Sequence, residues 1–129
     1  MTEQVPGTKA KASWKEEVEK IRDQFRSDVS AKQNAMWDAI RYTRPSNADV
    51  YDIFSLLISD MTDALWLRDD VVDSISGVRA YAFAVKKFAR ITQKEKLSKI
   101  AEDIIQLCNE TYPKIRSAMP SDVASMYVW

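Results

Sequence analysis

Residues 13–112 contain almost nothing that breaks a helix. The whole chain has 2 glycines and 4 prolines, and the prolines stand at positions 6, 45, 113 and 120. The turn pairs Asn-Gly and Asp-Gly of β-hairpins are absent, and no run alternates strictly between apolar and polar residues. The sequence therefore predicts an all-α protein, and its 129 residues are enough for one domain with a single core.

A long helix is predicted near the start of the chain. Ser13 and Glu16 form a capping box, and apolar residues keep helical spacing from there to about residue 43, before Pro45. Residues 1–12 precede the capping box and contain a Pro-Gly pair and lysines. We expect them to form a flexible basic arm ahead of a single helical domain at 13–129.

Three further helices complete a predicted four-helix bundle, with the last three over about residues 47–112. Each has a start signal and a row of apolar residues at helical spacing. The expected segments are, in chain order, Ser46 to Leu67, Asp69 or Asp70 to Ala89, and Thr92 to the residue before Pro113. Gly77 lies beside the apolar row of the third helix, where a missing Cβ permits close approach of a neighbour. A tail with a short helix from Ser121 follows at 113–129.

The net charge of the chain is zero because its positive and negative residues are equal in number. Its 19 Lys and Arg balance its 19 Asp and Glu. Residues 45–77 hold one cation and seven anions, whereas residues 78–116 hold nine cations and four anions. The predicted second helix is therefore acidic and the last two are basic, so the molecule has a strong field despite its zero net charge.

Basic residues also gather on one side of the first predicted helix. On a helical wheel Lys11, Lys15, Arg22 and Arg26 fall within about 60° of each other, next to the apolar row. The third predicted helix repeats the arrangement, with cations clustered around Phe83. A basic stripe bordering the packed side suits a helix that grips a polyanion, and an ordinary solvated surface is the other interpretation.

Several kinds of chemistry find no support in this composition. The chain has no histidine and no glycine-rich phosphate loop, so imidazole catalysis and histidine-based metal sites are excluded. Asp60 and Asp63, one helical turn apart, are a candidate pair for Mg²⁺ or Ca²⁺. The single cysteine, Cys108, stands in an apolar run and is predicted to be a buried, inert thiol. We expect no enzymatic activity and no cofactor.

The two ends of the chain have opposite character. The first residues lack the apolar core of a signal peptide, and no apolar run approaches the ~18 residues of a membrane span. The chain ends on an apolar segment that is hard to place in the core of a monomer. We expect these residues to contact a neighbouring subunit or a lipid surface: Met126, Tyr127, Val128 and Trp129.

An arm with lysines, one very long helix, a compact bundle with short loops and an apolar tail together resemble the major capsid proteins of filamentous and rod-shaped viruses of hyperthermophilic archaea. The resemblance covers the whole chain as size and layout. It implies a structural protein of the virion, made in the host cytoplasm, whose copies polymerise helically and wrap double-stranded DNA. It also implies a paralogous capsid subunit as a partner and, in some members, a surrounding lipid envelope.

In such a coat protein, cations contact the phosphate backbone without reading bases. The positions that the resemblance assigns to this role are Lys9, Lys11, Lys15, Lys20, Arg22, Arg26, Arg41 and Arg44, with Arg79, Lys86, Lys87 and Arg90 as a second group. The acidic residues of the first helix depart from this pattern, and a more basic paired subunit would compensate for them. Two other classes stay open: a small helical subunit of a CRISPR effector complex, and a helical protein–protein adaptor.

Overall fold

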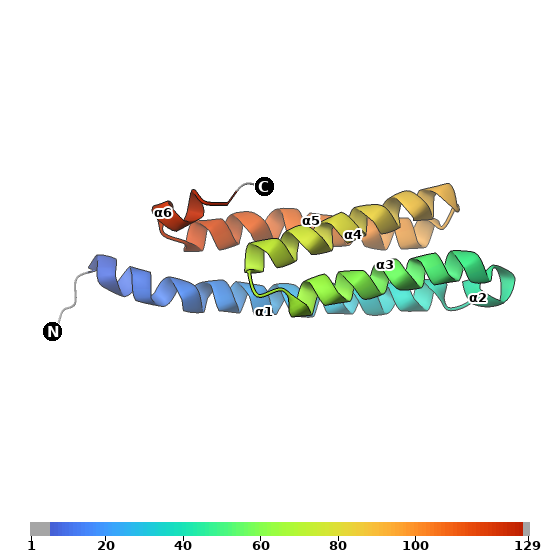
Figure 1. Cartoon of the computed structure of the whole chain (residues 1–129), viewed down its shortest axis with the longest axis horizontal. Coiled ribbons are helices and arrows are strands. Elements are labelled where there is room, and N and C mark those ends of the chain that lie inside the picture. Colours follow the sequence, from blue (N-terminus) through green and yellow to red (C-terminus); the bar gives the residue numbers. More distant parts are fainter. Residues whose placement is uncertain (1–5, 128–129) are drawn as a thin grey trace.

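The computed structural model describes residues 6–127, and it describes side chains for 13–43 and 45–127. This part of the chain forms the helices α1 (Pro6–Ile40), α2 (Thr43–Ser46), α3 (Ala48–Leu67), α4 (Val71–Ile91), α5 (Glu95–Ala118) and α6 (Ser121–Ala124). The four long helices pack as a bundle, shown in Figure 1, and α6 is the short helix of the tail. The prediction of an all-α bundle is confirmed.

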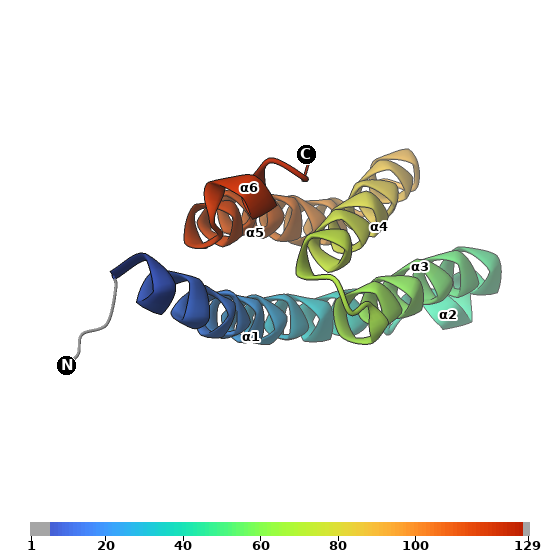
Figure 2. The ribbon, with the colours of Figure 1, turned by 60° about the vertical axis from the view of Figure 1, so that its left-hand side comes forward.

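Successive long helices run in opposite directions. α1 and α3 lie side by side as one layer, and α4 and α5 cover them as a second layer (Figures 1 and 2). Packing contacts join α1 to α3, α3 to α4, α4 to α5 and α5 back to α1. The first half of α1 and the last part of α5 extend beyond the other two long helices (Figure 1). Short connections explain this up-and-down order.

The first helix begins earlier than predicted. α1 starts at Pro6, so residues 6–12 of the expected arm are helical, and residues 1–5 lie outside the described residues. Proline is well tolerated in the first turn of a helix, and the alanines and lysines that follow favour helix. Ser13 therefore lies inside the helix rather than capping it. At the other end α1 stops at Ile40, and Pro45 lies in the single turn of α2.

Two aspartate or asparagine side chains cap the middle helices. Asp70 caps α4, as predicted, because its Oδ1 accepts from the N–H groups of Val72 at 2.9 Å and Asp73 at 3.2 Å. The predicted cap of α3 at Ser46 is wrong by one residue, since Asn47 Oδ1 accepts from Val50 N–H at 3.1 Å. Both types of side chain satisfy amide groups that have no partner inside the helix.

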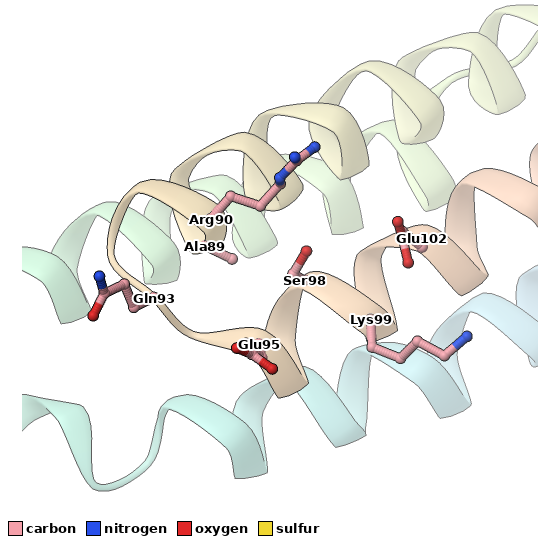
Figure 3. A pocket seen from close by; sticks show the side chains of 7 residues that line it. All are labelled: Ala89, Arg90, Gln93, Glu95, Ser98, Lys99 and Glu102. Atoms are coloured by element: carbon pink, nitrogen blue, oxygen red, sulfur yellow. The ribbon is translucent and has the colours of Figure 1, made fainter.

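The turn between α4 and α5 does not use the expected capping box. Thr92 Oγ1 instead donates back to the Phe88 carbonyl at 2.8 Å, and α4 ends there. Gln93, labelled in Figure 3, adopts a left-handed conformation with φ 59°, and the Lys94 N–H closes the turn on the Ala89 carbonyl at 2.7 Å. Lys94 precedes α5 without any side-chain cap.

The last long helix passes through Pro113. The predicted stop before this proline is wrong, because α5 continues to Ala118. Tyr112 and Ile115 are buried on the same side of α5 as Cys108. Proline in a helix costs about 3 kcal/mol through a lost hydrogen bond and a steric clash. Burial of these side chains supplies the free energy that keeps the helix intact.

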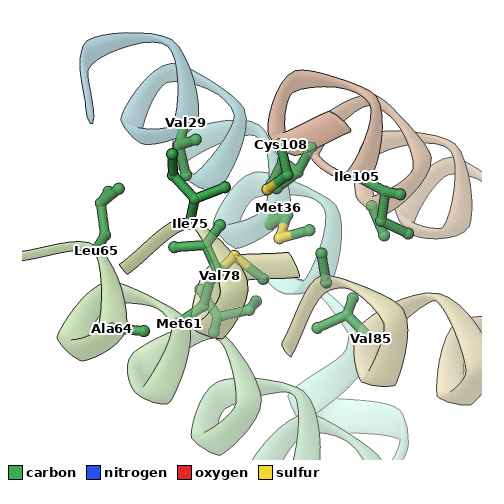
Figure 4. Packing of buried hydrophobic residues seen from close by; sticks show 14 of the residues in the cluster. Val29, Met36, Met61, Ala64, Leu65, Ile75, Val78, Val85, Ile105 and Cys108 are labelled. Carbon is green, nitrogen blue, oxygen red and sulfur yellow. The ribbon is translucent and has the colours of Figure 1, made fainter. Parts of the chain in front are cut away.

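One apolar core runs along the bundle axis. Figure 4 shows side chains from all four long helices meeting there, among them Val29, Met61, Val78 and Cys108. The Cys108 thiol is fully buried, and burial raises its pKa to about 12, as expected of an inert thiol. A Cβ on Gly77 would lie 2.5 Å from Arg68 Nη1 and 3.0 Å from Ala64 Cβ. The predicted close approach of helices at this glycine is confirmed.

The described part of the tail folds back on its own bundle. Tyr127 packs against the core, and its hydroxyl donates to Asp70 Oδ2 at 2.9 Å. Tyr112 Oη donates to the Tyr127 carbonyl at 3.5 Å. The apolar contact that we expected between Tyr127 and a neighbour is therefore made within the chain. Met126 is 78% exposed, and residues 128–129 lie outside the described residues.

Removing the Tyr127 hydroxyl should loosen this tail. We expect Tyr127→Phe to lower the free energy of unfolding by about 1 kcal/mol near neutral pH, through loss of one hydrogen bond to a charged group. The bond to Asp70, followed by burial, raises the pKa of Tyr127. Its contribution is therefore complete below the ordinary tyrosine pKa of about 10 and disappears as pH rises through the folded-state pKa.

Thermal unfolding of the wild type and Tyr127→Phe, compared at pH 8 and pH 11, measures this contribution. The difference in Tm should be present in full at pH 8 and smaller at pH 11, above the ordinary tyrosine pKa. An equal difference at both pH values would show that the hydroxyl does not hold the tail.

Candidate nucleic-acid interface

The first four cations of α1 lie within the amino-terminal half of the helix. Lys9 and Lys11 belong to the helix, and their side chains lie outside the described residues. Lys15 and Lys20 are exposed, and the Lys15 ammonium lies 5.8 Å from the centre of the Trp14 ring. The exposed carboxylates of Glu16, Glu17 and Glu19 stand between and beside these two lysines.

The next two cations of α1 are engaged within the molecule. Arg22 pairs with Asp23 at 3.2 Å. The Nε of Arg26 donates to the Leu65 carbonyl at 3.1 Å, and its guanidinium lies 5.1 Å from the centre of the Trp66 ring. Burial, followed by the charge of Arg22, lowers the pKa of Arg26. Arg26 thus ties α1 to the end of α3, a role that the wheel of a single helix does not reveal.

The remaining cations of this region lie at the far end of α1. Arg41 is exposed and pairs with Asp38 at 2.7 Å. A hydrogen bond with Tyr42, followed by the charge of Asp38, raises the pKa of Arg41. Arg44 lies in α2, and its side chain is outside the described ones. The predicted basic stripe of the first helix is therefore divided among ion pairs, carboxylates and an internal contact.

The second predicted group lies along α4. Arg79 stacks 5.3 Å from the centre of the Phe83 ring, and Lys86 pairs with Glu102 of α5 at 3.1 Å. Lys87 and Arg90 are exposed near the end of the helix. Together with Phe83 and Ile91, the last three of these cations line a surface hollow of roughly 340 Å³. Such a mixture of cations with an exposed ring suits nucleic acid better than the α1 side does.

The start of α5 adds cations that the sequence prediction left out. Six cations and one anion, Glu95, occur between positions 86 and 99, the densest basic stretch of the chain. We call this set the basic end; it consists of Lys86, Lys87, Arg90, Lys94, Lys96 and Lys99. Lys96 and Lys99 are exposed, and Lys99 lies 3.6 Å from Asp103. The turn at Gln93 brings the two halves of this set to one end of the bundle (Figure 3). A charge count over this window, rather than over whole helices, would have found it.

A second hollow at this end is not suited to a small anion. Its lining includes Arg90 and Lys99 but also Glu95 and Glu102, over roughly 690 Å³ (Figure 3). No side chain caps the first amide groups of α5. The positive excess therefore belongs to the basic end as a whole and not to this hollow, and this distribution favours phosphates on a large, extended ligand.

The described residues were predicted to include a candidate cation pair and no membrane span. Among the described residues no three histidine, cysteine or acidic side chains come together as a metal site, and the candidate pair Asp60 and Asp63 has no third ligand. No helix within residues 6–127 is long and apolar enough to cross a bilayer.

Comparisons of the chain with protein-family models, with curated proteins and with solved structures find no match.

Proposed function

We propose that this protein is a structural coat subunit of a nucleoprotein, which polymerises along double-stranded DNA and neutralises its phosphates without reading bases. The basic end carries this proposal. It concentrates six cations against one anion within fourteen successive positions, around the turn between α4 and α5. Phosphate contacts of this kind supply affinity that is independent of sequence.

Further features agree with a backbone contact. Lys87, Arg90, Lys96 and Lys99 are exposed, so they reach a ligand without rearrangement of the fold. The surface around them is open, and a large polyanion fits such a surface better than a deep pocket. The cations of α1 are a weaker candidate, because Arg22 and Arg26 are held by Asp23 and by Leu65. The resemblance to archaeal viral coat proteins, which rests on size and layout, gives the proposal its biological setting.

Salt-dependent binding to a labelled DNA duplex tests this function. Fluorescence anisotropy of the wild type should give an affinity that does not depend on sequence. The logarithm of the binding constant should fall with the logarithm of salt, with a slope of about −0.9 for each phosphate contacted. Four or five contacts correspond to a slope of about −4. Lys94→Glu, Lys96→Glu and Lys99→Glu combined should weaken binding about 100-fold at low salt and flatten the slope.

The matched control reverses Lys15 and Lys20 of α1, which are also exposed. Lys15→Glu with Lys20→Glu should change the affinity much less than the triple variant, and circular dichroism should show full helicity for both. Loss of binding in the α1 variant alone would move the interface to α1. Absence of duplex binding by the wild type at low salt would contradict the proposed function.

The same titration separates the alternatives. A strong preference for a single strand or a DNA–RNA hybrid would favour the small helical subunit of a CRISPR effector complex. Failure to bind any nucleic acid would favour a helical adaptor for an acidic protein partner.

A further inference from the structure

The outward face of α3 and α4 carries unpartnered apolar side chains. Eight large apolar residues of the described part are exposed, and six of them lie on these two helices. Trp66 meets Arg26 of α1, and the other five point away from the core: Ile53, Leu56, Leu67, Phe83 and Ile91. Leu56 is 62% exposed and Ile91 is 68% exposed. None of the eight lies on α5, whose described outward positions are polar or charged apart from Pro113. Apolar side chains gathered on one side of a small bundle are typical of an interaction surface.

The same face carries opposite charges on its two halves. Asp49, Asp52 and Asp63 are exposed on α3, and Lys87 and Arg90 are exposed on α4. Among the described side chains, no ion pair involves any of these five residues. The face is therefore self-complementary in charge, acidic along one helix and basic along the next.

Two internal contacts give the register of α3 against α4. Ser74 Oγ donates to the Ala64 carbonyl at 2.9 Å near one end, and the rings of Phe54 and Phe88 lie 4.9 Å apart near the other. The two helices run antiparallel between these contacts (Figure 1). Between these contacts Leu56 is therefore about level with Phe83. The same register, continued past the Phe54–Phe88 contact, brings Asp52 about level with Lys87 and Asp49 with Arg90.

We propose that two copies of this chain pair through the outward faces of α3 and α4, about a two-fold axis parallel to the helices. This axis places α3 of each copy on α4 of the other at unchanged height. Leu56 then meets Phe83, and Asp52 meets Lys87, each contact occurring twice. A two-fold axis across the helices would instead lay α3 on α3 and α4 on α4, which sets like charges against each other. Attraction between the acidic α3 and the basic α4 therefore favours the two-fold axis parallel to the helices.

This pairing specifies one contact between copies in the self-assembly that the proposed function requires. It rests on the self-assembly in that proposal and does not depend on DNA binding. Because the axis runs along the helices, both α4–α5 turns lie at the same end of the dimer. The dimer would thus present the α5-side cations of both copies, Lys94, Lys96 and Lys99, side by side, while Lys87 and Arg90 pair with acidic residues of the other copy. The test is made without DNA, so a monomeric protein would contradict the pairing and leave DNA binding to its own experiment.

Analytical ultracentrifugation of the full chain, at several concentrations, measures the pairing. The wild type should form a dimer, and Asp52→Lys alone and Lys87→Asp alone should each weaken it at least about tenfold, because every reversal acts at two symmetric contacts. Mixing the two variants should restore a dimer with one copy of each. In that mixed dimer the introduced lysine of one chain faces the introduced aspartate of the other, and a native pair of Asp52 and Lys87 forms the second contact.

Controls separate pairing from folding and from other geometries. Lys20→Asp reverses an exposed charge on α1 and should leave the dimer unchanged, while circular dichroism checks the helicity of every variant. A wild type that stays monomeric up to about 1 mM would overturn the proposal, since a dissociation constant in the millimolar range would be detected there. Failure of the mixture to recover a dimer would also overturn it.

Discussion

Replacing Phe54 by alanine is expected to lower the free energy of unfolding by about 3–5 kcal/mol. The Phe54 side chain is 0% exposed in the core, and its ring lies 4.9 Å from the ring of Phe88. Truncation removes the buried ring and leaves a cavity that close-packed neighbours fill only in part. Small domains are stable by about 5–15 kcal/mol, so this loss is a large fraction of the total.

Urea unfolding followed by circular dichroism measures the change. Tyr42→Ala is the matched control, because Tyr42 is an aromatic residue that is 77% exposed, and its truncation should cost less than about 0.5 kcal/mol. If Phe54→Ala were as stable as this control, α3 would not pack on α4 through the Phe54 ring.

Replacing Pro113 by alanine is expected to raise the free energy of unfolding by about 2 kcal/mol. Pro113 is exposed inside α5, where proline costs about 3 kcal/mol relative to alanine. Part of the gain is offset, because proline also restricts the unfolded chain by up to about 1 kcal/mol. Most single substitutions destabilise, so a gain of this size is a distinctive result.

The same unfolding experiment applies, with Lys114→Ala as the control for an exposed neighbouring position in α5. Lys114→Ala should be neutral within about 0.5 kcal/mol. A Pro113→Ala variant that is less stable than the wild type would show that the proline holds the end of α5 in a conformation that alanine does not adopt.

Local signals predicted the helices well and several of their ends poorly. The apolar rows identify which residues enter the core, and Asp70 follows directly from its position before an apolar row. The capping box of Thr92 and Glu95 has the right residue types, yet the Thr92 hydroxyl bonds to Phe88 within α4. A capping motif shows which hydrogen bonds a side chain is able to form. Packing of the two helices then determines which of these bonds forms.

The candidate site shows the same division. The sequence assigns a charge to every arginine and lysine, and it locates the excess of cations in residues 78–116; within this segment the excess belongs to α4 and the turn after it, since α5 has as many anions as cations. It does not reveal that Arg26 bonds to the Leu65 carbonyl of α3, or that Lys86 pairs with Glu102 of α5. These contacts join different helices, so they depend on which faces meet.

The sequence by itself determined that this chain is an all-α bundle whose second long helix is acidic and whose segment 78–116 is basic, because helical periodicity and charge are local properties. Only the tertiary structure decided that α5 passes through Pro113, that Tyr127 returns to Asp70, and that large apolar side chains of both α3 and α4 stay exposed. Those features arise from burial and from contacts between distant segments, and the free energy of such contacts outweighs local preference.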